Sequence, residues 1–464
     1  VMGVYFSPLE IGRRALRASQ LGLTVTGHNI ANVNTPGYTR QTVSLAPAPG
    51  DSANLRLTGS GVNIEGVRSA RDQFIDSRLQ SETATTGRLT AERDALYPVD
   101  GVFNDTGSNG GIQASLNNFF GAFRDLEASP GSQPLRSVVA DRARTLADAF
   151  RSTRTQLSEI RRDADRALRS TVDEANTLAE RIAGLNASIG QAEGTGANAS
   201  ELRDQRTEAV RQLAELTGAR SFENHDGSLT VTLGDGRAVV TGNQAHRLEA
   251  VSTPPDGLAQ ITLDGQAAVI SDGKIRGLES AISAIGGQIA AVDDLAAAVA
   301  GRVNALHTSG SDLNGNPGTA LFVASSGGAI NAANIDVSAA IRADPKLIVA
   351  AASGAGSGDA TVARSIAGLL SDPSSTAGTR SGSFAEIYAS IVRDAGTGVR
   401  NAEDALVTQQ AILQQTQAQR DSVSGVSLDE EAVALLQYQR SYEAAAKFLR
   451  IADEMTQTIL SLGQ

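Results

Sequence analysis

The sequence predicts a mainly α-helical protein with one small inserted β domain. Apolar residues recur at helical spacing over most of the 464-residue chain. Residues 219–274 differ, because Asp-Gly pairs there separate short runs of alternating apolar and polar residues, as in a series of β-hairpins. The helical pattern resumes at Ile275 almost without a gap. We therefore expect a long helical bundle, with the β unit inserted between two of its helices.

The C-terminal segment, residues 427–464, has the pattern of one long amphipathic helix. Ser427 and Glu430 form a capping-box sequence, and the acidic residues 429–431 lie where the positive end of the helix dipole is expected. Apolar or small residues follow three or four positions apart, at Leu435, Tyr438, Tyr442, Ala445, Leu449, Ala452, Met455 and Ile459. This stripe is narrow, which predicts packing against a partner helix.

The N-terminal segment supplies a candidate partner. A second capping-box sequence runs from Ser7 to Glu10, with Pro8 at the first helical position. The apolar heptad repeat that follows consists of Leu9, Leu16, Leu23 and Ile30. The two helices could pair antiparallel in a coiled-coil-like domain, or form a seam against other copies of the chain. Docking of each helix on a globular core is the alternative.

A turn sequence follows this first helix. Pro36 presets the φ angle of one central turn position and Gly37 permits a positive φ at the next, so the helix should end and the chain should reverse. A Pro-Gly pair alone indicates only an ordinary turn. In full, however, the stretch resembles the motif near the N-terminus of flagellar axial proteins, namely those of rod, hook and hook-filament junction. The stretch reads Ala31, Asn32, Val33, Asn34, Thr35, Pro36, Gly37, Tyr38, Thr39, Arg40.

Three further segments resemble one family of axial proteins, the hook-associated protein 1 family. Residues 424–455 (SGVSLDEEAVALLQYQRSYEAAAKFLRIADEM) are very similar to that family's ending. Residues 112–130 (IQASLNNFFGAFRDLEASP) and 202–219 (LRDQRTEAVRQLAELTGA) are also similar to family segments. The resemblance implies a structural protein of the bacterial flagellum, which self-assembles through its terminal helices at the hook-filament junction and provides the platform for filament growth.

The same resemblance implies partners and a location. The partners would be other copies of the chain, eleven in each helical repeat, the hook protein, the second hook-filament junction protein, and an export chaperone on the C-terminal helix. Export through the flagellar type III apparatus, with the N-terminal region as an uncleaved signal, would place the protein outside the cell. No nucleic acid and no membrane span are expected.

The pattern predicts three domains, two of them discontinuous. Residues 1–68 with 424–464 would form the terminal helical assembly domain. Residues 69–218 with 275–423 would form the helical bundle, in which the Phe-rich helix at 112–128 packs in the core. Residues 219–274 would form the inserted β domain. The Gly-, Ala- and Ser-rich residues 307–381 give no clear pattern.

Composition argues against several other classes of protein. The net charge of -11 disfavours nonspecific nucleic-acid binding, and the absence of cysteine excludes disulfides and thiolate metal sites. No run of 18 apolar residues and no Sec-type signal sequence was recognised. The Asp312, Asn314, Asn316 stretch lacks the glycine and glutamate positions of a calcium loop, so we expect a turn. We therefore expect no enzyme activity, no cofactor and no metal.

Two alternatives remain open at this stage. A flagellar hook or rod protein would share the motif at 31–40, although hook proteins have mainly β outer domains and this chain has long helices instead. A secreted coiled-coil adhesin or effector would use the β insertion at 219–274 as a binding head.

Overall fold

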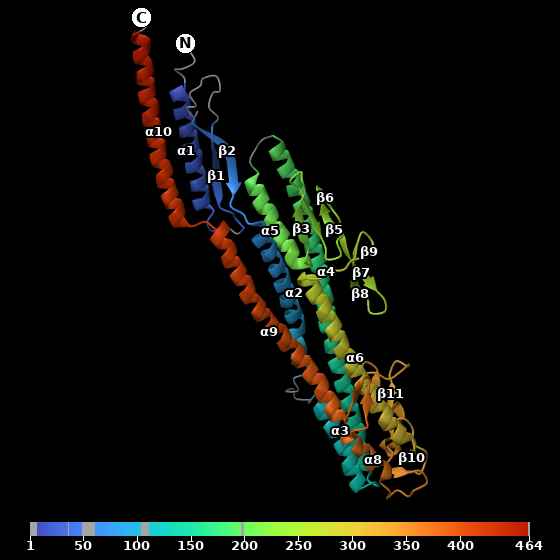
Figure 1. Ribbon diagram of the computed structural model, residues 1–464. Helices are drawn as coiled ribbons and strands as arrows, with labels where there is room; N and C mark the ends of the chain where they lie inside the picture. Colours follow the sequence, from blue (N-terminus) through green and yellow to red (C-terminus); the bar gives the residue numbers. More distant parts are fainter. Residues whose placement is uncertain (1–6, 36, 49–60, 104–110, 196–198, 463–464) are drawn as a thin grey trace.

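The computed structural model describes residues 7–35, 37–48, 61–103, 111–195 and 199–462, and it is long and narrow, with both chain termini at one end (Figure 1). Helices dominate, and a region of small β-sheets is inserted among them. The predicted fold class is therefore confirmed. The division into three domains stays a prediction.

The terminal unit consists of two helices and a hairpin. Helix α1 (Ser7–Ala31) and helix α10 (Leu428–Leu462) run antiparallel, and strands β1 (Gln41–Pro47) and β2 (Val62–Ser69) pack beside α1 (Figure 1). The strands pair antiparallel with a bulge at Ser44/Leu45. Both predicted terminal helices are therefore present, and they contact each other. The side chain of Ser7, which belongs to the predicted N-terminal capping box, lies outside the described residues.

The body is a bundle of long helices. Its four long helices are α2 (Gln73–Phe103), α4 (Gln133–Gly194), α6 (Gly273–Thr308) and α9 (Phe384–Ser424). Helix α4 has 62 residues and spans about 93 Å at 1.5 Å per residue. The shorter helices α3 (Ile112–Ala128) and α5 (Ser200–Thr217) pack on α4. As predicted, the phenylalanines of α3 lie in the core, and the ring centroids of Phe119 and Phe120 are 5.0 Å apart in an edge-to-face contact.

Helix α6 is more apolar than the sequence analysis indicated, which recognised no stretch that could span a membrane. It is long and apolar enough, by length and composition, to cross a membrane, and it is the one such helix in the described part of the chain. In the structure it packs against α2 and α4, and Val292, Val299 and Val303 are fully buried in the body. A core helix with few charges meets the same composition test as a membrane span.

Residues 309–383 lie at the end of the body farthest from the termini (Figure 1), and they include most of the stretch 307–381 that gave no clear sequence pattern. They form small two-stranded pairings and short helices: β10 (Gly310–Ser311), β11 (Phe322–Ala324), β12 (Ile335–Val337), α7 (Ala339–Ala343), η2 (Pro345–Leu347), β13 (Ala351–Ala352), α8 (Thr361–Gly368), η3 (Leu369–Ser371), β14 (Thr376–Ala377) and β15 (Arg380–Ser381). The Asp312 carboxylate accepts hydrogen bonds from the backbone N–H groups of Asn314 and Asn316, both at 2.8 Å. This is the expected turn.

The inserted β unit contains two small antiparallel sheets. The first has the order β3-β4-β5-β6, formed by Arg220–Glu223, Leu229–Thr232, Ala238–Thr241 and Gln244–Ala245. The second has the order β7-β8-β9, formed by Leu248–Thr253, Leu258–Leu263 and Gln266–Ala267. Both sheets contact helix α4, and their apolar residues share a core with α4 and α5.

Two asparagines of α4 hold one strand in each of these sheets. The Asn176 amide accepts a hydrogen bond from the N–H of Leu248 and donates one to the C=O of Leu248, both at 2.8 Å. The Asn186 amide makes the same two bonds with Leu229, at 3.0 Å and 2.9 Å. On β7, which is an edge strand, the Asn176 amide thus takes the place of a neighbouring strand. On β4, which is an inner strand, the Asn186 amide satisfies the backbone groups of the first residue.

We expect Asn176→Ala to lower the free energy of unfolding by about 1–3 kcal/mol, because both backbone groups of Leu248 would then be buried without partners. Urea unfolding followed by circular dichroism would measure the loss. Asn117→Ala, at an exposed position of α3, is the control and should change stability by less than about 0.5 kcal/mol. Equal effects of the two substitutions would contradict the edge-strand role.

His307 gives the body a pH-dependent stability. It is fully buried, its Nδ1–H donates to the C=O of Thr319 at 2.5 Å, and its Nε2 accepts from the N–H of Val349 at 3.0 Å. Burial lowers the pKa of His307 from 6.5 to about 4, and the positive charge of Arg136 acts in the same direction. The neutral ring is therefore the form that the folded protein holds.

Above pH 6.5, His307 is neutral in the folded and the unfolded chain, and the folded protein has its full stability. As the pH falls from 6.5 toward 4, the unfolded chain binds a proton on His307 while the folded chain does not, so the free energy of unfolding decreases. The loss should be on the order of 3 kcal/mol. Thermal unfolding between pH 7 and pH 4 would measure it. The variant His307→Gln should show a shallower dependence on pH over this interval, and an equally steep dependence would refute the assignment to His307.

Candidate assembly site

Helices α1 and α10 approach each other closely because glycines of α1 lie in the contact. A Cβ atom added to Gly12 would lie 2.6 Å from Leu449 Cγ, and one added to Gly22 would lie 2.4 Å from Tyr438 Cε1. Real Cβ atoms do not approach other atoms this closely, so larger residues would push the helices apart. Leu449 and Tyr438 belong to the predicted stripe of α10, and each packs directly on a glycine.

The buried face of α1 differs from the predicted heptad. Leu9, Leu16, Leu23 and Ile30 are only half-buried. The buried residues of α1 are smaller or polar: Gly12, Ala18, Ser19, Gly22, Val25, Thr26 and Asn29. The reason is that α1 contacts α10 and the β1-β2 hairpin as well, so its most buried face lies between these two neighbours and the heptad lies at the rim.

The predicted stripe of α10 is covered in part. Ala445 and Ala452 are buried, and Leu435, Tyr438 and Leu449 are half-buried. By contrast, Tyr442 and Met455 are exposed, with 40% and 60% of their surface accessible. The side chain of Ile459 lies outside the described residues.

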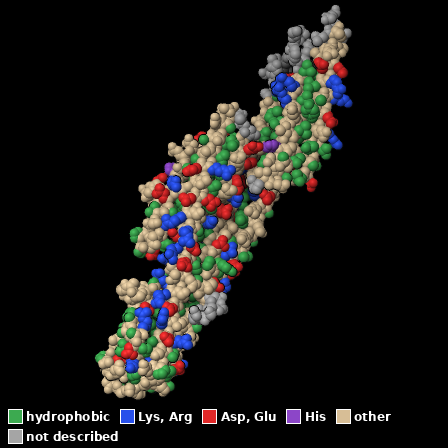
Figure 2. All heavy atoms as spheres, turned by 180° about the vertical axis from the view of Figure 1, so that it is seen from behind, with side chains coloured by type: hydrophobic (Ala, Val, Ile, Leu, Met, Phe, Trp, Pro, Cys, Tyr) green, Lys and Arg blue, Asp and Glu red, His purple; other side chains and the backbone are tan. Residues whose placement is uncertain are grey.

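A second apolar stripe of α10 lies mostly outside the contact with α1, which it meets at Phe448, whose Cδ1 lies 3.3 Å from a Cβ atom added to Gly12. We call it the outer stripe, and its members lie three, four or eleven residues apart and so share one face of the helix. They are Val433, Ala444, Phe448, Ile451 and Met455, all exposed. Figure 2 shows hydrophobic side chains on the surface of the terminal unit. Helix α10 therefore has apolar surface for more than one neighbour, and the described chain supplies only α1.

The end of α1 is joined to the start of α10 by a buried polar group, which we call the Asn29 network: Asn29, Tyr38, Arg40, Gln41 and Glu431. The Asn29 amide nitrogen donates to Gln41 O at 2.9 Å and to Glu431 Oε2 at 3.0 Å. Its oxygen accepts from Gln41 N at 2.9 Å and from the Tyr38 hydroxyl at 2.8 Å. Both donors and both lone pairs of the amide are thereby used.

Glu431 of α10 binds Arg40, the last residue of the turn motif at 31–40. Its side chain is 3% exposed, and Oε1 lies 2.7 Å from Arg40 Nε. The other side of the Arg40 guanidinium binds the exposed Glu430 at 2.7 Å, while the Arg40 N–H donates to Ser424 O at the end of α9. Because Glu431 lies in the first turn of α10, its charge also opposes the helix dipole. The network therefore fixes the point where α9 ends and α10 begins.

The predicted turn is present within the described residues. Tyr38 N donates to Thr35 O at 3.2 Å and Gly37 has φ 78°, as a turn with glycine at its second central position requires. Pro36 lies outside the described residues, and Ala31 and Asn34 are exposed. Asn32 accepts a hydrogen bond from the Thr35 hydroxyl and so acts only locally.

Burial raises the pKa of Tyr38 to about 12, and the nearby carboxylates of Asp204, Glu201 and Glu431 add to this shift. The phenol therefore stays protonated and donates to Asn29. Of the network, the sequence motif identified Tyr38 and Arg40 but missed Asn29, Gln41 and Glu431. Asn29 could have been found as a polar residue within the helical pattern of α1. From the sequence, Glu431 was given only a role at the positive end of the helix dipole.

We expect Glu431→Ala to weaken the terminal unit by about 2 kcal/mol or more, because it leaves an Asn29 N–H group buried without its acceptor and removes the buried partner of Arg40. Hydrogen exchange should then increase in α1 and α10 but not in α4. Glu430→Ala removes the exposed partner of the same arginine and should cost less than about 1 kcal/mol. Similar exchange in both variants would contradict a central role for Glu431.

Comparisons with known proteins agree with the arrangement of the helices. Residues 96–322 match the family described as flagellar hook-associated protein FlgK helical domain. Residues 417–462 match the flagellar basal body rod FlgEFG protein C-terminal family, and residues 9–39 match the flagella basal body rod protein family. The two rod-type matches therefore cover most of α10 and of α1, and the first match covers much of the body.

Full-length relatives carry one name. Flagellar hook-associated protein 1 of Bacillus subtilis is 27% identical, over 98% of this chain and 98% of that protein. The Escherichia coli protein of the same name is 24% identical, over 96% of this chain and 98% of its own length. The solved structure of the flagellar hook junction protein FlgK from Burkholderia pseudomallei shares the fold, with a TM-score of 0.66 at 16% identity over 76% of this chain and 100% of that chain.

The matching helical-domain family, the relatives that match over nearly the whole chain and the shared fold all lead to the same assignment. The chain is a homologue, over nearly its whole length, of the proteins named flagellar hook-associated protein 1.

Proposed function

We propose that the terminal unit is the assembly element of this structural protein of the flagellar hook-filament junction, and that other copies of the chain cover the outer stripe of α10. The observation that carries the proposal is the outer stripe itself. Ile451 and Met455 are 49% and 60% exposed on a helix whose other apolar face already packs on α1. Apolar surface of this kind, repeated along one helix face, is typical of a protein-protein contact.

Self-assembly gives a physical reason for leaving this stripe open. Two helices and one hairpin bury little apolar surface alone, so the terminal unit gains most of its stability when neighbours cover it. Before assembly the unit would be less stable than the body, which has extensive apolar cores. Ordering and assembly would then occur together, which limits premature polymerisation.

Further partners follow from the family resemblance as proposals. The hook protein would contact the assembled chain on one side and the second hook-filament junction protein on the other, with eleven subunits in each helical repeat. An export chaperone would cover α10 before assembly, and export would place the chain outside the cell. In this role the chain is a scaffold for filament growth, and we assign it no chemical reaction.

The experiment that tests the function uses a strain that lacks this gene. Bare hooks seen by electron microscopy, with unpolymerised filament subunits in the medium, are the expected result. Missing hooks would instead favour a hook or rod protein, and normal filaments would favour the adhesin alternative. Either of these results would refute the junction role.

Complementing the same strain with variants tests the outer stripe. We expect Ile451→Asp to be folded and exported, because the residue is half-exposed, but to restore filaments at least tenfold less often than the unaltered gene. A charge buried between apolar neighbours is strongly unfavourable. Gln439→Asp adds the same charge at an exposed α10 position outside the stripe and should restore filaments normally. Normal filaments with Ile451→Asp would refute contact through this stripe.

A further inference from the structure

Helix α5 makes polar contacts with the terminal unit and with the segment that leads into the body. The Asp204 carboxylate accepts a hydrogen bond from Thr39 N at 3.3 Å, and its other oxygen lies 3.3 Å from Arg71 NH2. Arg71, in the connection between β2 and α2, also donates to the Thr207 hydroxyl at 2.7 Å. Helix α5 contacts strand β2 as well. Neighbouring residues of one helix thus hold both the end of the motif and the start of the body.

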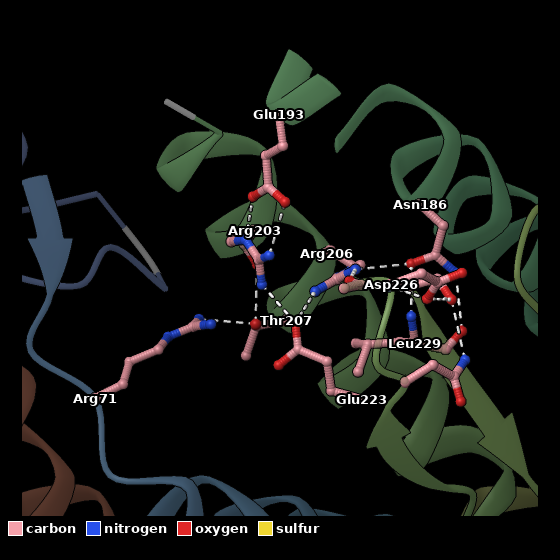
Figure 3. Close-up of polar contacts among 12 residues, drawn as sticks. Arg71, Asn186, Glu193, Arg203, Arg206, Thr207, Glu223, Asp226 and Leu229 are labelled. Carbon is pink, nitrogen blue, oxygen red and sulfur yellow. Dashed lines mark hydrogen bonds and ion pairs between the residues drawn. The ribbon is translucent and has the colours of Figure 1, made fainter. Parts of the chain in front are cut away.

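The same turns of α5 hold the inserted β unit (Figure 3). Arg203 pairs with Glu193 of α4 at 2.8 Å and with Glu223 of β3 at 2.5 Å. Arg206, which is 3% exposed, donates to Asn186 Oδ1 at 2.9 Å and to the backbone oxygen of Gly227 at 2.8 Å. The guanidinium of Arg206 is therefore held by a helix of the body and by the β unit together.

Apolar packing does not fix the terminal unit on the body. Among the described residues, neither apolar core cluster includes a residue of α1, β1, β2 or α10. The space beside α5 is instead an open cleft of about 1380 Å³, with charged residues such as Arg71, Arg203, Glu223 and Arg420 in its wall. Interlocked apolar side chains normally resist rotation of one part against another. Here two chain connections and polar contacts must do so. The polar contacts are those of α5 and those that Arg420 of α9 donates to the backbone oxygens of Gly37 and Tyr38, at 3.4 Å and 3.2 Å.

We propose that Asp204 and Arg206 are positioning residues, which fix the orientation of the terminal unit relative to the body by way of α5. Asp204 and Arg71 hold the terminal side of the helix, and Arg206 and Arg203 hold α5 against the β unit and α4. The β unit therefore braces α5, which gives the insertion a mechanical role. This proposal concerns the free chain and stands or falls independently of the assembly contact of the outer stripe.

The burial of these groups makes the contacts directional. Burial raises the pKa of the Asp204 carboxyl group and lowers the pKa of Arg206 to about 10. Each charge is therefore costly unless its partners keep their positions. A rotation of the terminal unit that moved Thr39 and Arg71 away would leave Asp204 buried without compensation, so one orientation is favoured over its neighbours.

Electron spin resonance distance measurements can test the proposal, because the chain contains no cysteine and two labels can be placed without competing sites. One label pair, Gln20→Cys with Glu180→Cys, spans from α1 to α4. A second pair, Glu180→Cys with Gln410→Cys, lies within the body as a reference. All three positions are exposed. Circular dichroism melting would confirm that each labelled variant is folded.

We expect Asp204→Asn, Arg71→Gln and Arg206→Gln each to at least double the width of the α1-to-α4 distance distribution, with the reference pair unchanged. Glu201→Gln, on the same helix, removes an exposed contact of α5 with His28 of α1 and should broaden the α1-to-α4 distribution much less than the other three, because its side chain is 65% exposed. Unchanged widths in folded Asp204→Asn and Arg71→Gln would overturn the positioning role. Broadening in these two but not in Arg206→Gln would overturn the brace formed by the β unit.

Discussion

The hydrogen bond between Asn29 and Glu431 is the contact on which the arrangement of the terminal unit depends. It joins residues 402 positions apart, and the same Asn29 amide also sets the start of strand β1 through both backbone groups of Gln41. The body lowers the entropy cost of closing this long loop. Its antiparallel helices α2 and α9 pack together and so bring the two connections to the terminal unit side by side. A buried polar contact of this kind also favours one register of α1 against α10 over others.

The sequence predicted elements well where a single periodicity controls them. The helix expected at 112–128 is α3 with the same bounds. Strand β1 begins only at Gln41, since the backbone N–H of Arg40 donates to Ser424 O at the end of α9. Contacts such as Thr39 with Asp204 could not be predicted, since no local pattern encodes a partner 165 residues away.

The seam between the terminal helices shows a different limit of sequence analysis. A heptad of large apolar residues predicted the helix and its approximate face, and Leu16 and Leu23 are indeed half-buried. Periodicity does not show which neighbour each side of the face will meet. The closest contact instead forms where glycine removes a side chain, at Gly12 and Gly22, because the gain from close packing there exceeds what larger residues could obtain at the same spacing.

Different forces thus act in different parts of this chain. The body is held by apolar cores, which are stable without partners. Polar contacts of α5 connect the terminal unit with the body. Such contacts depend on direction and so favour one angle between the two parts, but their net contribution to stability is small. The outer stripe of α10 is apolar surface that remains exposed in the described chain. Under the proposals made for α5 and for the outer stripe, a subunit would arrive with its orientation set, and its terminal unit would obtain further stability from the contact that incorporates it.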